Sequence, residues 1–376
     1  NGPAFAKGRE VYQTDGTLSG TNQSTSIYSL GGGAPREIVN HNGVLFISAH
    51  NGSHGYELWK SDGLGMFNGG TTTWVKDINP YFGINGDRGS NPSHLTSVSQ
   101  LLFFSATDGT NGYELWKSDG TSDRTVMVKN INPGAGDSNP ANLLNINGVL
   151  YFTADNGTDG IELWKSDGTD AGTVMIKNIS AGSNNSSPAS LTNISGVLYF
   201  SAEDGVNGNE LWKSDGTDAG TVMVKDINAS LNSSSPGSLV NINGVLYFSA
   251  DDGTNGVEVW KSDGTNVGTV LVKDIFSGPD SSNPSLFTLV NGVTAFAADD
   301  GIAGRELWRS DGTALGTVLV KDILPGSAGS NPTVLKKVGE NVLFAANDGV
   351  RGNEVWLSNG AEQGTRVMSY IEPGIA

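Results

Sequence analysis

The sequence predicts an all-β fold, a β-propeller built from four-stranded antiparallel blades. The first observation is a repeated motif, Glu-Leu-Trp-Lys-Ser-Asp-Gly-Thr or a close variant, which starts at Glu57, Glu114, Glu162, Glu210, Glu258, Glu306 and Glu354, with a diverged copy at Glu10. From position 114 the motif returns every 48 residues, at 162, 210, 258, 306 and 354. A fixed period of this size indicates units that bury their surfaces against one another. The second observation is the high glycine content, 53 residues, which indicates many tight turns.

The repeat at residues 236–283 shows the four strands in order. Its alternating or apolar runs predict strands at residues 238–242, 245–250, 258–262 and 269–275. Asn243-Gly244 between the first two runs is a strong hairpin signal, and Asp252-Gly253 and Asp263-Gly264 predict the other two turns. No segment has the period of a helix, so each repeat is expected to be an up-and-down sheet.

The second strand is apolar along its whole length, which is typical of a strand that is covered on both faces. Neighbouring sheets that pack face to face around an axis provide this cover, and closure into a ring protects the end blades. A β-helix would need a shorter period. We therefore expect one propeller domain over residues 1–376. Its repeats are 1–34 (partial), 35–91, 92–139, 140–187, 188–235, 236–283, 284–331 and 332–376.

The N-terminal repeat contains matches only to part of the second strand, and to the third and fourth strands. This pattern predicts an eight-bladed propeller whose first blade is incomplete. The alternative is a seven-bladed propeller with an N-terminal appendage. In the first case the missing strand leaves an edge that another chain could pair with.

Composition excludes several classes of protein. A formal charge of −17 disfavours binding to nucleic acid or anionic lipid, and no long apolar run predicts a membrane span. The sequence has no cysteine, which excludes a disulfide scaffold and any Cys-ligated metal. It begins at Asn1 without a signal peptide, so we expect it to be a processed or excised piece.

Three recurring residues have structural interpretations. The tryptophans of the motif are expected to fill the space between blades, although a ring of sugar-stacking platforms is an alternative. The aspartate before each motif glycine, as in Asp263-Gly264, is expected to accept amide hydrogen bonds across its own turn. The lysines after the tryptophans and in the fourth strand are expected to form exposed cross-strand pairs with the motif glutamates.

The turn before each motif is the candidate calcium site. It reads Asp-Gly-x-x-Gly-x-Glu in five repeats, which places two carboxylates on a glycine-rich loop, and oxygen ligands of this kind suit Ca²⁺. The alternative is a hairpin loop that is capped by its aspartate. The candidate ligands are Asp108, Glu114, Asp204, Glu210, Asp252, Glu258, Asp300, Glu306, Asp348 and Glu354.

The repeat at residues 35–91 breaks the symmetry. It carries extra residues in two loops, and all four histidines lie in or beside it. Apolar and aromatic residues on loops are typical of interaction surfaces. The candidate partner-binding residues are His50, His54, Met66, Phe67, Trp74, Tyr81 and Phe82. A transition-metal site at His50 and His54 is an alternative, but the sequence offers no third ligand nearby.

The motif, with Gly-Val-Leu-Tyr-Phe-Ser-Ala-Asp-Asp-Gly before it in residues 244–253, resembles the ELWxxDGT repeat family over nearly the whole chain. The Ser-Asp-Gly-Thr string is also similar to the structural Asp-box turn of sialidase-type propellers. The family resemblance implies a secreted or cell-surface bacterial repeat protein and provides no catalytic residues. It leaves the ligand open.

From these observations we expect a module that is not an enzyme. It would act in a structural or protein-interaction role, with calcium as its one candidate cofactor. Its partner would be a protein or a glycan at the cell surface or in an extracellular assembly. A multivalent carbohydrate-binding propeller is the alternative. A polysaccharide lyase or hydrolase is disfavoured, because the repeated carboxylates are equivalent and the sequence has no recognisable catalytic motif.

Overall fold

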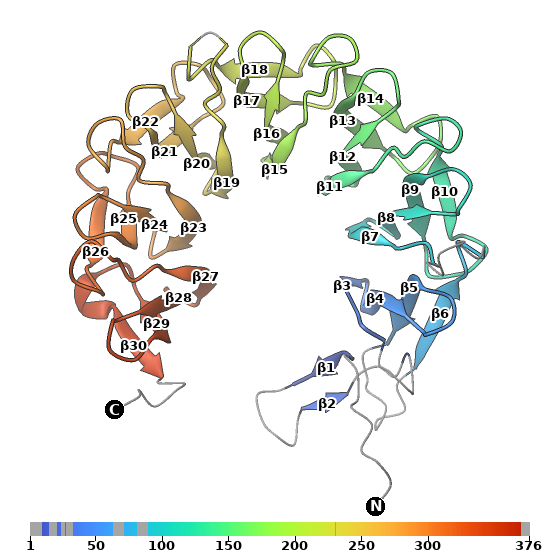
Figure 1. Ribbon diagram of the computed structural model, residues 1–376, viewed down its shortest axis with the longest axis horizontal. Helices are drawn as coiled ribbons and strands as arrows, with labels where there is room; N and C mark the ends of the chain where they lie inside the picture. Colours follow the sequence, from blue (N-terminus) through green and yellow to red (C-terminus); the bar gives the residue numbers. More distant parts are fainter. Residues whose placement is uncertain are drawn as a thin grey trace, which may run out of the picture. The chain divides into compact units, whose positions relative to one another are not determined.

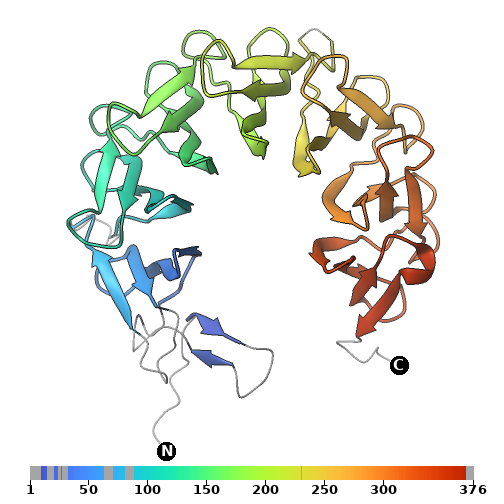
Figure 2. The same cartoon turned by 180° about the vertical axis from the view of Figure 1, so that it is seen from behind.

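The computed structural model describes residues 10–14, 21–23, 27, 33–62, 71–80, 89–229 and 231–369. The chain divides into two compact units, Asn1–Ser187 (unit 1) and Pro188–Ala376 (unit 2). The division falls between two of the predicted repeats. Within each unit, successive four-stranded sheets follow one another along the chain (Figure 1; Figure 2 gives the view from behind).

Unit 1 contains three four-stranded antiparallel blades and one two-stranded sheet. The first blade is β3 (Glu37–His41), β4 (Val44–His50), β5 (Tyr56–Ser61) and β6 (Thr72–Lys76). The second is β7 (Ser93–Val98), β8 (Leu101–Thr107), β9 (Tyr113–Ser118) and β10 (Val126–Lys129). The third is β11 (Ala141–Ile146), β12 (Val149–Asp155), β13 (Ile161–Ser166) and β14 (Val174–Lys177). The small sheet pairs β1 (Tyr12–Gln13) with β2 (Asn22–Gln23).

Unit 2 contains four such blades. They are β15 (Ala189–Ile194) to β18 (Val222–Lys225), β19 (Gly237–Ile242) to β22 (Val270–Lys273), β23 (Ser285–Val290) to β26 (Val318–Lys321), and β27 (Thr333–Val338) to β30 (Arg366–Ser369). Their inner members are β16 (Val197–Glu203), β17 (Asn209–Ser214), β20 (Val245–Asp251), β21 (Val257–Ser262), β24 (Val293–Asp299), β25 (Arg305–Ser310), β28 (Asn341–Asn347) and β29 (Asn353–Ser358). The short 3-10 helix Glu362–Gly364 precedes β30, and the described residues include no helix long and apolar enough to cross a bilayer.

The prediction of an all-β propeller is therefore confirmed, with seven complete four-stranded blades among the described residues. In the blade β19–β22, Ile242 pairs with Val245 across Asn243 and Gly244, which have φ angles of 52° and 86°. Three predicted strands match to within one residue, but the fourth ends at Lys273 and not at residue 275. It ends early because the amide of Ile275 turns to donate to the Glu258 side chain.

The core lies between successive blades of a unit. One face of β15–β18, with Tyr199 and Leu211, packs against the facing side of β19–β22, where Phe248 and Trp260 lie. Phe248 is fully buried and Trp260 is 5% exposed. The other motif tryptophans are also buried. This confirms that these tryptophans fill the space between blades, and it leaves no repeated aromatic platform for sugars.

The N-terminal repeat keeps part of this architecture. Ile27 packs against Ile47, Ala49 and Trp59 of the first complete blade, and the Glu10 carboxylate accepts a hydrogen bond of 2.8 Å from the amide of Gly33. The motif glutamate of each of the next six repeats makes the equivalent contact with the linker that follows it. Blade counts of seven and of eight with one incomplete are both consistent with this arrangement.

Candidate functional site

A buried glutamate at the start of each third strand holds the linker that leads to the next blade. Glu258 is fully buried, and its carboxylate accepts hydrogen bonds from the amides of Ile275 (3.0 Å), Phe276 (3.2 Å) and Ser282 (3.0 Å). The Ser282 hydroxyl donates a fourth, at 2.6 Å. The Ser282 carbonyl in turn accepts from the amide of Asp299 in the next blade, at 2.9 Å. We call this arrangement the glutamate clamp.

The clamp recurs in both units. The serine hydroxyl that donates to the glutamate comes from Ser90, Ser138, Ser186, Ser234, Ser282 and Ser330, in the linkers after Glu57, Glu114, Glu162, Glu210, Glu258 and Glu306. The sequence analysis missed these serines. They could have been found in the sequence, because each stands two positions before the proline that opens the next repeat.

Burial changes the acidity of the clamp. Desolvation raises the pKa of Glu57 and of Glu114 to about 7, although the hydrogen bonds from serine and backbone donors oppose this. The same cause raises the pKa of Glu162, Glu210, Glu258 and Glu306. These groups are buried parts of the scaffold, so their perturbed acidity has a structural explanation.

The aspartate of the preceding turn has different partners. One carboxylate oxygen of Asp252 accepts from the amides of Thr254 (2.9 Å) and Asn255 (2.8 Å), and the other accepts from the Asn255 side chain (2.8 Å). Partial burial opposes ionisation, but these hydrogen bonds outweigh it and hold the pKa of Asp252 below its usual value. Asp252 therefore caps its own turn.

The same cap is present in the other four candidate turns, where Asp108, Asp204, Asp300 and Asp348 accept from the amides two and three residues later. Glu354, the remaining glutamate, is 1% exposed. In the four candidate turns that begin at Asp108, Asp204, Asp252 and Asp300, the aspartate faces its own turn and the glutamate faces the linker. Across the described residues, no group of three or more His, Cys, Asp or Glu side chains could hold a metal ion. The arrangement thus gives the calcium hypothesis no support.

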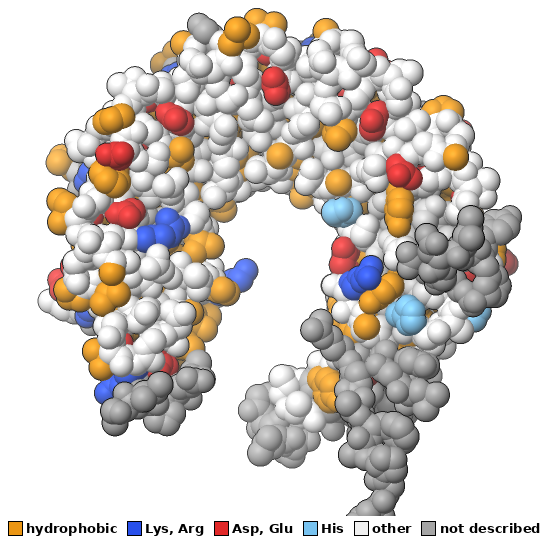
Figure 3. Space-filling view, in the orientation of Figure 1, with side chains coloured by type: hydrophobic (Ala, Val, Ile, Leu, Met, Phe, Trp, Pro, Cys, Tyr) orange, Lys and Arg blue, Asp and Glu red, His pale blue; other side chains and the backbone are white. Residues whose placement is uncertain are grey.

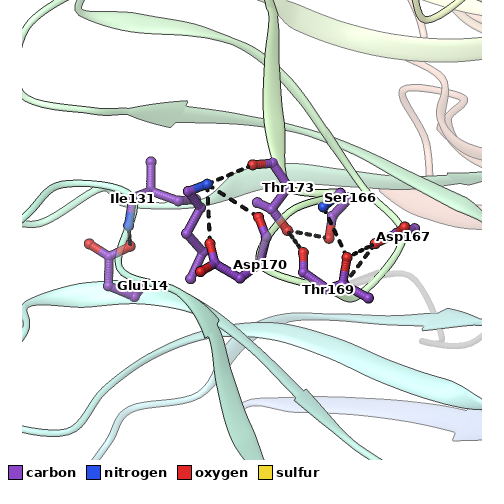
Figure 4. A network of polar contacts seen from close by, with 9 residues as sticks. Glu114, Ile131, Ser166, Asp167, Thr169, Asp170 and Thr173 are labelled. Atoms are coloured by element: carbon purple, nitrogen blue, oxygen red, sulfur yellow. Dashed lines mark hydrogen bonds and ion pairs between the residues drawn. The ribbon is translucent and has the colours of Figure 1, made fainter.

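The repeated lysines correct another expectation. The motif glutamates are buried in the clamp, and carbonyl groups of the next blade accept hydrogen bonds from Lys60, Lys76, Lys117, Lys129, Lys213, Lys225, Lys261, Lys273 and Lys321. Lys261 Nζ donates to the Gly312 carbonyl at 2.8 Å, and Lys273 Nζ to that of Thr317 at 2.8 Å. In unit 1, Lys129 donates to the Thr173 carbonyl at 3.1 Å and pairs with Asp170 at 3.2 Å; Figure 4 labels both of these partners. The lysines therefore connect blades.

The Asp-Gly hairpins that receive these lysines are internally bonded. Asp167 accepts from the Thr169 amide (2.8 Å) and hydroxyl (2.7 Å) (Figure 4). Gly168 has a φ of 88°. Ser166 and Thr173 share a hydrogen bond of 2.7 Å between their hydroxyls. The expected turn cap is confirmed, and with it nearly every repeated polar residue has a role in the scaffold.

Residues that differ from the repeat gather in the first complete blade. Trp74 stands where the other blades have Met127, Met175, Met223, Leu271, Leu319 and Val367. Its ring lies 6.3 Å from that of Trp59 and 4.7 Å from that of His54. His50 lies edge-on to Tyr56 at 5.4 Å, and the exposed Arg36 lies over Tyr56 at 3.4 Å.

Of the predicted partner-binding residues, His54 and Trp74 are thus brought together, and His50 lies against Tyr56, over which Arg36 lies. We call these two groups of contacts, five residues in all, the aromatic cluster. Met66, Phe67, Tyr81 and Phe82 lie outside the described residues. On the face seen in Figure 3, acidic side chains recur from blade to blade, whereas the histidines lie over unit 1.

A pocket of about 420 Å³ lies where the same blade meets the second blade. Its walls include His41, Phe46 and Lys60 from the first blade, and Gln100, Asp119 and Arg124 from the second. The sequence analysis missed it. The available signal is three departures from the repeat: His41 for an aliphatic residue, Phe46 for the tyrosine of three later blades, and Arg124 for a glycine.

No family model matches the chain, and no curated protein sequence matches it. The fold is similar to that of a propeller-containing prolyl endopeptidase, with a TM-score of 0.51 and 11% identity over 89% of this chain and 49% of that one. Two other similar structures are the computationally designed protein Ika8 (TM-score 0.46, 15% identity, 86% and 83% covered) and a puromycin hydrolase (TM-score 0.44, 13% identity, 96% and 56% covered). The chain spans about half the length of the endopeptidase.

This comparison corrects the expectation that the chain is not an enzyme. That expectation rested on the lack of catalytic motifs in the repeats, whereas the same fold forms about half of a solved endopeptidase chain. Absent motifs in this fold therefore do not exclude an enzyme. At 11% identity the likeness shows the fold alone, and no catalytic residue is carried over from it.

Proposed function

We propose that this propeller is an interaction module that binds a protein partner through the aromatic cluster of its first complete blade. The observation that supports this is the contrast between repeated and unrepeated residues. The repeated glutamates, lysines and aspartates have partners within the scaffold. The aromatic cluster departs from the repeat at His50, His54 and Trp74, and it provides two groups of ring contacts, one of which includes the cation of Arg36.

The chemistry of the cluster suits a protein partner. Trp, Tyr and Arg are the residue types that most often dominate the energetics of protein interfaces. Tyr56, Trp74 and both histidines are half-buried, so part of each ring is open to solvent and the rest is held in place by packing. A rigid aromatic surface loses little conformational entropy on binding.

We place the partner at the cell surface or in an extracellular assembly. The resemblance to the ELWxxDGT repeats supports this setting, and the strongly acidic composition favours a partner other than nucleic acid. The edge of the N-terminal repeat offers a second contact, where a strand of another chain could pair.

The test replaces His54 and Trp74 by residues that the repeat itself uses, in the double variant His54→Asn, Trp74→Met. Cross-linking and affinity capture from envelope and culture medium of the source organism should recover a partner with the native chain and lose it with this variant. The matched control is Asn207→Asp, Met223→Leu in a regular blade, which should retain the partner. A partner that the double variant retains in full, with an unchanged melt, would overturn the proposal.

A further inference from the structure

We propose that the pocket between the first two complete blades binds a sugar acid, a pyranose that carries a carboxylate. This site is separate from the aromatic cluster. Trp74 lies on the opposite face of the blade from Phe46 and Lys60, and His50 and Tyr56 lie four residues from Phe46 and Lys60 along β4 and β5 and do not line the pocket. The proposal therefore does not depend on the protein-binding function.

The pocket exists because three residues depart from the repeat. In three later blades a tyrosine stands in the place of Phe46, whereas the second blade also has a phenylalanine there, Phe103. The hydroxyls of Tyr199 and Tyr247 reach the glycine of the next Asp-Gly turn, at Gly264 and Gly312. Phe46 approaches the equivalent Gly120 with its ring edge but has no hydroxyl there. The space that the hydroxyls of Tyr199 and Tyr247 occupy in their blades is thus left open beside Phe46.

The rim of the pocket is also changed. Arg124 stands where the other hairpins have Gly172, Gly220, Gly268, Gly316 and Gly364. Its side chain is 78% exposed, and its Nε lies 3.6 Å from Asp119 Oδ2. One side of the guanidinium therefore neutralises Asp119, and the remaining N–H groups are available to a ligand.

The other walls provide the groups that a sugar ring requires. Lys60 Nζ donates to the Gly120 carbonyl at 2.8 Å, which uses one of its three N–H donors. The side chains of Asn42 and Gln100 lie 3.5 Å apart and offer donors and acceptors to hydroxyl groups. Val44, Phe46 and Leu101 form the apolar wall, against which the C–H face of a pyranose can pack.

The charge and size of the pocket favour an acidic sugar over a neutral one. Lys60 and Arg124 are opposed by Asp119 alone, so the walls carry a net positive charge in a chain with a charge of −17. The volume of about 420 Å³ falls in the range of small-ligand sites, ~300–1,000 Å³. A groove of about 190 Å³ shares Val44 and Lys60 with the pocket and runs past Ser61, Asp62 and Thr73, which leaves room for a second ring. Its carboxylate, Asp62, accepts hydrogen bonds from the amide and hydroxyl of Thr71, so the net positive charge belongs to the first ring's pocket.

Hydrogen bonds between the two blades also fix the walls of the pocket. His41, which replaces an aliphatic residue, is 5% exposed, and its Nδ1 lies 2.8 Å from Ser97 Oγ of the second blade. The Asn42 side chain donates to the Ser99 carbonyl at 3.4 Å. These contacts tie the two walls of the pocket together, so the binding groups are held in place before a ligand arrives.

The test is calorimetric titration of the whole chain with glucuronate, glucose and acetate as probes. Glucuronate should bind, and glucose and acetate should bind at least about tenfold more weakly, because each lacks either the carboxylate or the ring. Equal affinities for glucuronate and glucose, or no heat with glucuronate, would overturn the proposal.

Two variants restore the repeat and should close the site without loss of the fold. Arg124→Gly removes the cation, and Phe46→Tyr fills the open space, so each should weaken glucuronate binding at least about tenfold. Lys337→Gln, a charge change on β27 of unit 2, which contributes nothing to the walls of the pocket, should leave binding unchanged. If Phe46→Tyr fails to fold, Gln100→Gly takes its place. Native affinity in Arg124→Gly would contradict the assignment.

Discussion

The buried start of each third strand and the exposed turn just before it carry two acids with the same period but with opposite environments. In the repeat 236–283, Glu258 is fully buried and binds four donors from the linker, whereas Asp252 binds amides of its own turn. The glutamate joins a blade to the next, and the aspartate shapes one loop. Two residues that are repeated equally can therefore contribute unequally to the free energy of unfolding. The contribution depends on whether the residue joins two blades or only shapes its own loop.

The largest difference should appear when the clamp is removed. Glu258→Ala leaves the amides of Ile275, Phe276 and Ser282 without their acceptor in a buried place, and unsatisfied buried donors cost ~1–3 kcal/mol each. We expect the free energy of unfolding to fall by about 4 kcal/mol, measured by urea denaturation. Glu203→Ala, at an exposed strand end, is the matched control and should change stability by less than ~0.5 kcal/mol. A loss below about 1 kcal/mol for Glu258→Ala would show that water enters the clamp.

The second difference is the sign of the pH dependence. Burial raises the pKa of Glu114 from 4.5 to about 7, so between these values the folded state binds more protons than the unfolded state. Its contribution to stability is complete below about pH 4.5 and is lost as the pH rises to about 7. The pKa of Asp252 is lowered, so its contribution is present at higher pH and is lost as the pH falls through that lowered value.

We therefore expect the free energy of unfolding to be greatest in mildly acidic solution and to fall toward about pH 8, by about 1–3 kcal/mol for each of the clamps of Glu57 and Glu114. Glu114→Gln should reduce the slope between about pH 5 and about pH 8, whatever its effect on absolute stability. Urea denaturation across this range measures the slope. Stability that increases steadily to neutral pH would mean that the clamp carboxylates remain charged in the fold.

Sequence alone predicted the strands and turns well, because Asn-Gly and Asp-Gly turns and alternating strands are local signals. It could not pair Glu258 with Ser282, because the two are 24 residues apart and the period does not say which side chains meet. The lysines were misread for the same reason, since Lys261 reaches Gly312 in the following blade. The sugar-acid pocket depends on His41, Phe46 and Arg124 meeting across a blade interface, which no spacing rule describes.

The smallest effect should come from the exposed turn, and it also decides the calcium question. Asp252→Ala should lower the free energy of unfolding by about 1 kcal/mol, because the amides of Thr254 and Asn255 can turn to water when the cap is lost. Excess chelator, and then calcium, should leave the melting temperature of the native chain unchanged, since the Asp252 oxygens already accept hydrogen bonds and Glu258 faces the linker. A calcium-dependent rise in melting temperature that Asp252→Ala removes would reverse this assignment. It would mean that the turn exchanges its amide hydrogen bonds for a cation, and that the two acids of the repeat share a role after all.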